Sequence, residues 1–149
     1  MARPPAKTAR PSSNNSHLAG EYFVAAELYK RGFSVAMTLG NAKAIDLFAE
    51  KDLRTINVQV KAISVRKNVG WPIRSKRHVF SKIMYVFVCL NGPDTPPTFF
   101  IAFGREVRPR VHEYSTRAII NYGDLNSPQF LGRWDKIEAA LHSSAARTV

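Results

Sequence analysis

The most informative part of the chain reads IDLFAE at residues 45–50 and TINVQVKAI at residues 55–63. Both runs are rich in strand-forming residues, and the polar segment 51–54 separates them, so we expect two neighbouring strands joined by a loop. Asp46, Gln59 and Lys61 interrupt these otherwise apolar strands. Gln59 and Lys61 are two residues apart and therefore share one face of their strand, which a hairpin can bring beside Asp46. Ionisable groups in such places are costly unless they are paired or bind a ligand.

The preceding residues predict a helix and a further strand. Apolar residues recur at helical spacing after Ser16, a residue type that suits an N-cap, and Gly32 suits the position after a helix C-terminus. Glu21 lies in the first turns of this expected helix. The run 33–39 is rich in strand formers, so a helix followed by a three-stranded meander forms the expected core.

The rest of the chain predicts further strands and helices. We expect strands at Tyr85–Leu90 and Thr98–Phe103, a short helix around Arg105–Tyr114 and a last helix over about Arg133–His142. These elements indicate an α/β (α+β) fold with a central mixed β-sheet flanked by helices. The expected organisation is a flexible basic leader at residues 1–15 and a single domain at residues 16–149.

The chain carries a large excess of positive charge. It has 149 residues, with 22 Lys and Arg against 11 Asp and Glu, and a formal net charge of +11. Nucleic acid is the first candidate partner for such a chain; anionic lipid, an acidic protein or mere basicity are the alternatives. The leader and residues 64–78 contain no acid. The cations in the second segment are candidate phosphate contacts: Arg66, Lys67, Arg74, Lys76 and Arg77. For Trp71, which lies among them, we favour a place in the core over base stacking.

Other features of the sequence exclude several kinds of protein. No run approaches the roughly 18 apolar residues of a membrane-spanning helix, and the N-terminal residues lack a signal core, so we expect a cytoplasmic protein without membrane contact. The single Cys89 cannot form an intramolecular disulfide and is expected to be buried. There is no Gly-rich phosphate loop, nucleophile elbow or zinc pattern. We assign no role to the histidines, which lack metal-ligand spacing: His17, His78, His112 and His142.

A family resemblance links the candidate residues. Glu21 in the first helix, the segment Ala44–Ala49 with Asp46, and Val58–Lys61 resemble the PD-(D/E)XK nuclease superfamily, above all its restriction-endonuclease-like and Holliday-junction-resolvase-like members. The resemblance covers roughly residues 16–63. Ile45 stands where the motif has proline, and Gln59 stands where the family usually has an acid. Glutamine offers an oxygen ligand but no negative charge, so metal affinity should be lower than with the acid.

The resemblance implies a restriction-endonuclease-like fold and a magnesium- or manganese-dependent DNA endonuclease, acting on branched or mobile-element DNA. It implies that Glu21, Asp46, Gln59 and Lys61 form the active site. Asp46, Gln59 and the backbone carbonyl of Val60 would bind the metal, while Glu21 would lie in its outer shell. Lys61 would orient the attacking water or stabilise charge on the phosphate. Cutting both strands needs two active sites, so a homodimer is expected by analogy.

Less specific interpretations remain for the same residues. Asp46 and Lys61 could form an ordinary cross-strand ion pair, Gln59 could be an edge residue, and Glu21 could complement the helix dipole. For the whole chain, the competing hypothesis is a nuclease-fold protein that binds DNA or a protein partner without cutting. A third is a partner-binding domain that does not bind nucleic acid.

Overall fold

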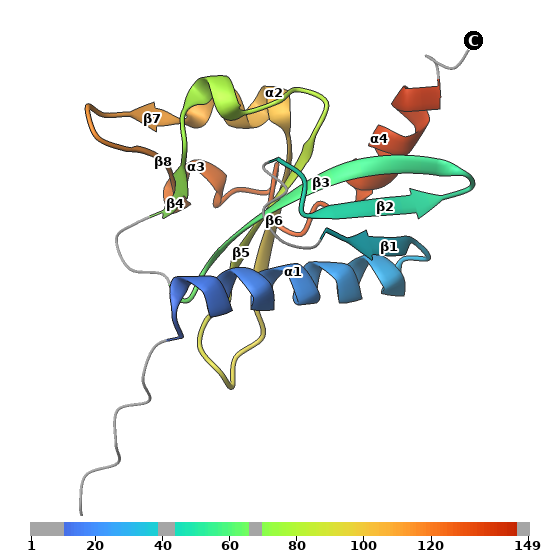
Figure 1. Cartoon of the computed structure of the whole chain (residues 1–149), viewed down its shortest axis with the longest axis horizontal. Coiled ribbons are helices and arrows are strands. Elements are labelled where there is room, and N and C mark those ends of the chain that lie inside the picture. The colour runs from blue at the N-terminus through green and yellow to red at the C-terminus, as the bar shows by residue number, and fades with distance from the viewer. Residues whose placement is uncertain (1–10, 39–43, 66–69, 146–149) are drawn as a thin grey trace, which may run out of the picture.

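The computed structural model describes residues 11–38, 44–65 and 70–145 of the chain. Its centre is a mixed five-stranded sheet in the order β1-β2-β3-β5-β6, in which β3 and β5 are parallel and the other neighbours are antiparallel (Figure 1). The strands are β1 (Ser34–Met37), β2 (Leu47–Lys51), β3 (Arg54–Ile63), β5 (Met84–Cys89) and β6 (Thr98–Phe103). The expected α/β class with a mixed central sheet is confirmed.

A second, three-stranded sheet has the order β4-β8-β7 and is antiparallel. Its strands are β4 (Gly70–Ile73), β7 (His112–Glu113) and β8 (Ala118–Asn121). The helices are α1 (Ser13–Lys30), α2 (Gly104–Val107), α3 (Tyr122–Leu125) and α4 (Asp135–Ala145), with 3-10 turns η1 (Lys76–His78) and η2 (Arg108–Arg110). None of these helices is long and apolar enough to cross a membrane.

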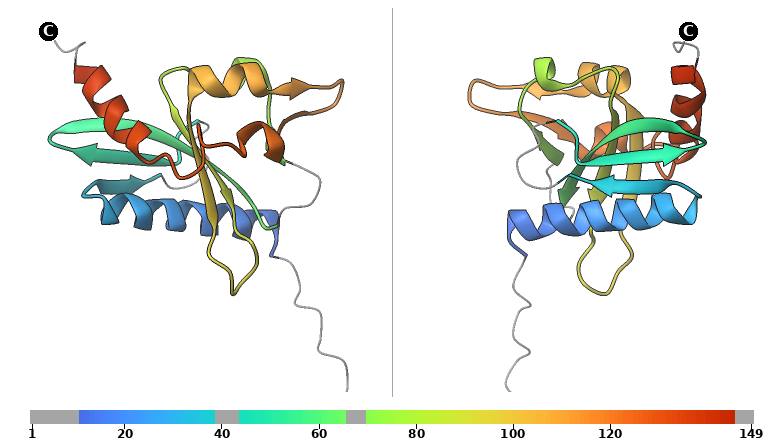
Figure 2. Two further views of the ribbon diagram at one scale, coloured as in Figure 1. Left: turned by 180° about the vertical axis from the view of Figure 1, so that it is seen from behind. Right: turned by 45° about the vertical axis from the view of Figure 1, so that its right-hand side comes forward.

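Helices α1 and α4 pack on one face of the main sheet, and the second sheet covers the other (Figure 2). Strand β5 is buried along its whole length because alternate side chains enter the two cores. Val86 contributes to the core under α1 and α4, whereas Tyr85 and Phe87 contribute to the core under the second sheet. Gln59 and Lys61 pair with Tyr85 and Phe87 in the parallel register, so they face the second sheet as well.

Trp71 joins the two sheets. Its side chain is fully buried, its indole N–H donates to the carbonyl of Val88 at 3.0 Å, and its ring contacts Phe87, Phe100 and Tyr122. The expected core position of this residue is confirmed, and its ring is not accessible to a base.

Several predicted boundaries are wrong. Helix α1 begins at Ser13, with Ser12 as N-cap accepting from the Asn15 N–H at 3.1 Å, so Ser16 is a buried residue inside the helix. The loop expected at residues 51–54 is a two-residue turn, because Lys51 and Arg54 are the last paired residues. Both turn residues have positive φ, as tight hairpins favour.

The C-terminal half departs further from expectation. The helix expected over 105–114 stops after one turn and continues as the 3-10 turn that contains Pro109, which lacks the N–H for a helical hydrogen bond. The strands at 70–73 and 118–121 and helix α3 were not predicted, and the last helix begins at Asp135 rather than Arg133. Most of the expected leader, at residues 1–10, and the turn at 40–43 lie outside the described residues.

Candidate active site

Three hydrogen bonds with neighbouring backbone groups hold Asp46 in place. Its N–H donates to the carbonyl of Val58 at 2.9 Å, and its own carbonyl accepts from the N–H of Thr38 at 3.0 Å. Carboxylate oxygen Oδ2 accepts from the N–H of Val60 at 2.8 Å. These contacts fix the side chain against β3 and leave the second oxygen, Oδ1, to face α1. A buried acid held in this way is preorganised before any ligand arrives.

Helix α1 brings Glu21 to the same place because it lies very close to β3. At Gly20, a Cβ atom would come within 2.5 Å of the Cβ of Ala62, so only glycine allows this approach. Glu21, the next residue, is buried beside Asp46. Burial raises the pKa of Glu21, and the negative charge of Asp46 raises it further. Two carboxylates therefore share a site that lacks enough positive charge for both.

His17 completes this cluster, although its position in the sequence indicated no role. Its Nε2 atom lies 2.8 Å from Oε1 of Glu21, one helical turn away, and 3.6 Å from Oδ1 of Asp46. The contact with Asp46 and the charges of both carboxylates raise the pKa of His17, against the opposing effect of burial. One ligand atom from each of the three residues lies within 4.8 Å of the other two. The spacing of His17 and Glu21 was a usable signal, but only the fold adds Asp46.

Gln59 and Lys61 line a cavity of about 320 Å³. Arg74, His78 and Phe80 complete much of its wall. Burial lowers the pKa of Lys61, while the charge of Asp46 acts in the opposite direction. Asp46 thus contacts His17 in the cluster, and its charge also acts on Lys61 in the cavity. Among the described residues, the ion pair of Asp46 is with His17, at 3.6 Å, and Lys61 feels the charge of Asp46 without a direct ion pair to it.

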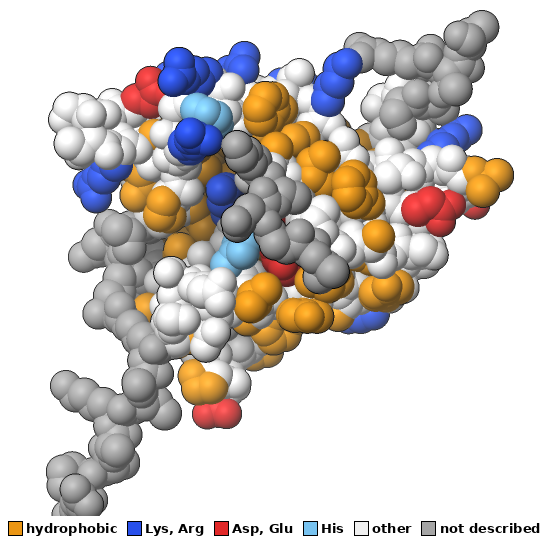
Figure 3. Space-filling view, viewed as in Figure 1, with side chains coloured by type: hydrophobic (Ala, Val, Ile, Leu, Met, Phe, Trp, Pro, Cys, Tyr) orange, Lys and Arg blue, Asp and Glu red, His pale blue; other side chains and the backbone are white. Residues whose placement is uncertain are grey.

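Cations continue outward from this cavity over η1, α2 and η2. Arg74, Lys76 and Arg77 are exposed. A neighbouring hollow of about 450 Å³ is lined by Lys76, Arg105 and Arg108 together with Ser81. Lys and Arg side chains gather over this part of the molecule in Figure 3. Arg105 and Arg108 were not among the expected phosphate contacts, and the expected Arg66 and Lys67 lie outside the described residues.

The donor set suits a divalent cation. Ligands at right angles around a metal, each about 2.1 Å from it, lie about 3 Å apart, which is close to the spacing of His17 from the two acids. A cation would also neutralise the crowded carboxylates that raise the pKa of Glu21. Glu21 is close enough to take part directly, whereas the resemblance implied an outer-shell role. Whether the side chain of Gln59 and the carbonyl of Val60 contribute oxygen ligands stays a prediction.

Comparison with known proteins gives structural neighbours only. No protein-family model matches the sequence, and no curated protein matches it. The chain is similar in structure to the bacterial homing endonuclease I-Ssp6803I, with a TM-score of 0.62, 16% identity, and coverage of 92% of this chain and 99% of that one. It is also similar to Hjc, a Holliday junction resolvase from Archaeoglobus fulgidus, with a TM-score of 0.52, 13% identity, and coverage of 80% and 97%.

These likenesses establish the fold. Both neighbours have restriction-endonuclease-like PD-(D/E)XK folds, and the present chain shares this architecture over nearly the full length of each. The fold that the resemblance implied is therefore confirmed. At these identities the comparison concerns the fold, and the chemistry has to be argued from the site itself.

Proposed function

We propose that this restriction-endonuclease-like protein is a metal-dependent endonuclease that hydrolyses phosphodiester bonds in DNA. One observation carries the proposal: the buried carboxylates of Glu21 and Asp46 lie together, and Lys61, which feels the charge of Asp46, lines a cavity together with the exposed Arg74. Such hydrolysis requires acids that bind a metal cation and a lysine that contacts the phosphate. It also requires a positively charged surface along which DNA can bind.

In this proposal the residues divide the work between them. Asp46 and Glu21 hold a magnesium or manganese ion, with Gln59 as a neutral ligand. The bound ion supplies Lewis-acid activation of the scissile phosphate and of the attacking water. Lys61, fixed on β3, places its positive charge where negative charge develops on the phosphoryl oxygens. Val60 keeps the carboxylate of Asp46 in position through its N–H.

The cations beyond the cavity provide the approach for DNA. Arg74 lines the cavity that contains Lys61, and Lys76 lines the next hollow together with Arg105 and Arg108. We propose that the phosphate backbone follows this path across η1 and α2. Because one structural neighbour is a homing endonuclease and the other a Holliday junction resolvase, mobile-element and branched DNA are the substrates to test first. We propose a homodimer as the cleaving species, since two strands require two active sites.

The test is cleavage of plasmid, single-stranded and four-way-junction DNA with magnesium or manganese. Wild type should cut at least one substrate, and Asp46→Asn and Lys61→Ala should each lower the rate at least about 100-fold. Asp124→Asn is the matched control, because Asp124 also pairs with a histidine, His112, at 2.9 Å but lies away from the cavity. Light scattering of the same samples, with and without DNA, tests the dimer. Failure of wild type on every substrate would overturn the proposal.

Gln59 favours one second candidate, a protein of this fold that binds DNA or a protein partner without cutting it. The missing acid removes a negative ligand and weakens metal binding. This candidate predicts salt-sensitive DNA binding that survives Asp46→Asn and is lost when Arg74, Lys76 and Arg77 are neutralised together. Gln59→Glu separates the two candidates further, because restored cleavage would show that only the acid was lacking.

A further inference from the structure

His17 carries an inference that deepens, and rests on, the proposed metal-dependent function. It projects from α1 one turn before Glu21, and its Nε2 atom lies between the two carboxylates of the cluster. The side chain of His17 is 42% exposed, whereas those of Glu21 and Asp46 are 8% and 13% exposed. The imidazole therefore forms the solvent-facing wall of the cluster, and its nitrogen points inward.

The distances are those expected if His17 and the two acids bind one ion. Nε2 of His17 is 2.8 Å from Glu21 and 3.6 Å from Asp46, which brackets the spacing of about 3 Å between adjacent ligands of one ion. The atom that makes these contacts is also the atom that would donate to a metal. A cation in contact with both acids would thus meet this nitrogen without a change in the position of α1.

We infer that His17 is a direct ligand of the catalytic metal and gives the site a preference for manganese over magnesium. Magnesium binds oxygen ligands almost exclusively, whereas divalent transition metals accept imidazole nitrogen readily. Gln59 supplies no charge, so a nitrogen ligand would compensate for the affinity that a third acid would otherwise give. Manganese is the ion of this class that also suits carboxylate and water ligands.

A simpler role for His17 is to neutralise the two acids while the site contains no metal. In that case a cation would displace the imidazole, and removing His17 would leave metal affinity unchanged or raise it. The two roles therefore predict opposite effects of the same substitution, and direct observation of the ligand nitrogen decides between them.

The experiment uses the full chain with manganese and no DNA. Pulsed electron paramagnetic resonance of the bound manganese detects a ligated ¹⁴N nucleus, and calorimetry gives the dissociation constants for manganese and magnesium. Wild type should show the nitrogen signal. His17→Asn should lose it and bind manganese at least tenfold more weakly, with a change of less than about threefold for magnesium. His17→Gln provides a second variant, and circular dichroism checks that both are folded.

His112→Asn is the matched control, because His112 is 45% exposed and also contacts a carboxylate, that of Asp124. It should keep the nitrogen signal and both affinities. Bound manganese without a nitrogen signal, or unchanged manganese affinity in folded His17 variants, would overturn the inference, even if wild type cleaves DNA. A nitrogen signal in a protein that cuts no DNA would support the inference and contradict the proposed function.

Discussion

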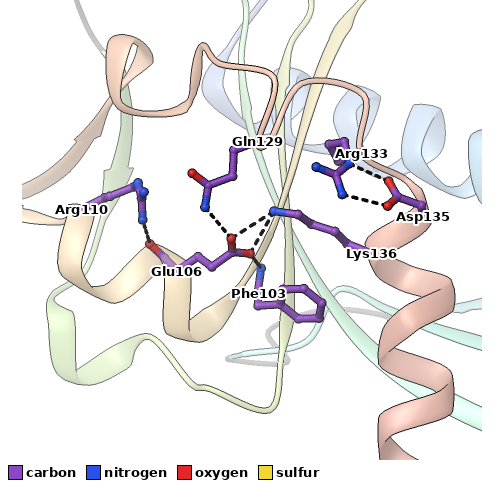
Figure 4. A network of polar contacts seen from close by, with 7 residues as sticks. All are labelled: Phe103, Glu106, Arg110, Gln129, Arg133, Asp135 and Lys136. Atoms are coloured by element: carbon purple, nitrogen blue, oxygen red, sulfur yellow. Dashed lines mark hydrogen bonds and ion pairs between the residues drawn. The ribbon is translucent and has the colours of Figure 1, made fainter.

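Two glutamates that are shielded from solvent lie in opposite electrostatic surroundings. Glu106 accepts from Lys136 at 3.0 and 3.1 Å, from Gln129 at 2.9 Å and from the backbone N–H of Phe103 at 2.9 Å (Figure 4). Burial alone would raise the pKa of Glu106, but these donors lower it below its ordinary value. Glu21 is more deeply buried, has a second acid as neighbour, and its pKa is raised.

The contrast separates a group that stabilises the fold from one that is left poised for a ligand. Every oxygen of the Glu106 carboxylate has a donor, so this network ties α2 to α4 and needs nothing further. In the cluster of Glu21 and Asp46, two ionised carboxylates carry more negative charge than a protonated His17 can neutralise. A stable fold that retains such unfavourable electrostatic repulsion is expected to use the site for function.

Breaking the network around Glu106, in which Lys136, Gln129 and Phe103 donate to the carboxylate, should have the largest effect on stability. We call it the satisfied network. Lys136→Met leaves Glu106 without its cation, and the side chain of Lys136 is only 7% exposed. We expect the free energy of unfolding to fall by about 3 kcal/mol, measured by urea denaturation. Lys30→Met is the control, because Lys30 is 70% exposed and its ion pair with Glu27 should contribute less than about 0.5 kcal/mol. Equal effects of the two substitutions would contradict this view.

Moving the cluster of His17, Glu21 and Asp46 should have the next largest effect. Gly20→Ala places a methyl group against Ala62 and forces α1 away from β3, which we expect to cost about 1–2 kcal/mol after the gain in helix propensity. Because Glu21 and His17 move with the helix, manganese affinity should fall as well. Gly123→Ala is the control, since nothing lies within 4 Å of the added atom. Wild-type stability and affinity in Gly20→Ala would show that the close approach is not needed.

Removing one acid of the cluster should change stability in the opposite direction. Glu21→Gln relieves the repulsion with Asp46, so at pH 7 without metal the free energy of unfolding should rise by about 0.5–1 kcal/mol. DNA cleavage by the same variant should fall sharply. Glu106→Gln, the matched change in the satisfied network, should instead lower stability. If Glu21→Gln and Glu106→Gln both lower the free energy of unfolding, the electrostatic surroundings of Glu21 and Glu106 do not differ as described.

The smallest effects are differences in pH dependence, measured with a chelator present. The lowered pKa of Glu106 contributes stability above the ordinary value of 4.5, and this contribution is lost as pH falls below it. The stability difference between wild type and Glu106→Gln should therefore shrink in acid.

The raised pKa of Glu21 has the reverse sign. Its contribution is fully present below 4.5 and is lost as pH rises through the raised value. The advantage of Glu21→Gln over wild type should therefore grow with increasing pH. Parallel pH profiles for the two variants would contradict the assignment of the two environments.

The sequence predicts the meander and part of the site because the information there is local. Alternation places Gln59 and Lys61 on one face, and a short hairpin places Asp46 beside them, so neighbouring residues suffice. Helical spacing identifies α1 and the apolar residues of α4 for the same reason.

The features that the sequence does not predict depend on contacts between residues far apart in the chain. Strand β4 is four residues long and contains Pro72, and it pairs with β8 nearly fifty residues later, so neither run shows a strand pattern by itself. A role for His17 can be recognised only from its contact with Asp46, which lies on a different element of the fold. Arg105 and Arg108 join the basic surface because α2 and η2 pack beside η1, a contact that no motif encodes.

The tight β2–β3 hairpin has a consequence for how such a protein can change. It carries Asp46 just before its first strand, and Gln59 and Lys61 on its second, so the proposed chemistry belongs to one compact unit of the chain. The exposed cations near the cavity belong to later segments around the second sheet. Substitutions that retarget the basic surface can therefore accumulate without disturbing the hairpin, so substrate preference and cleavage chemistry can evolve separately in this fold.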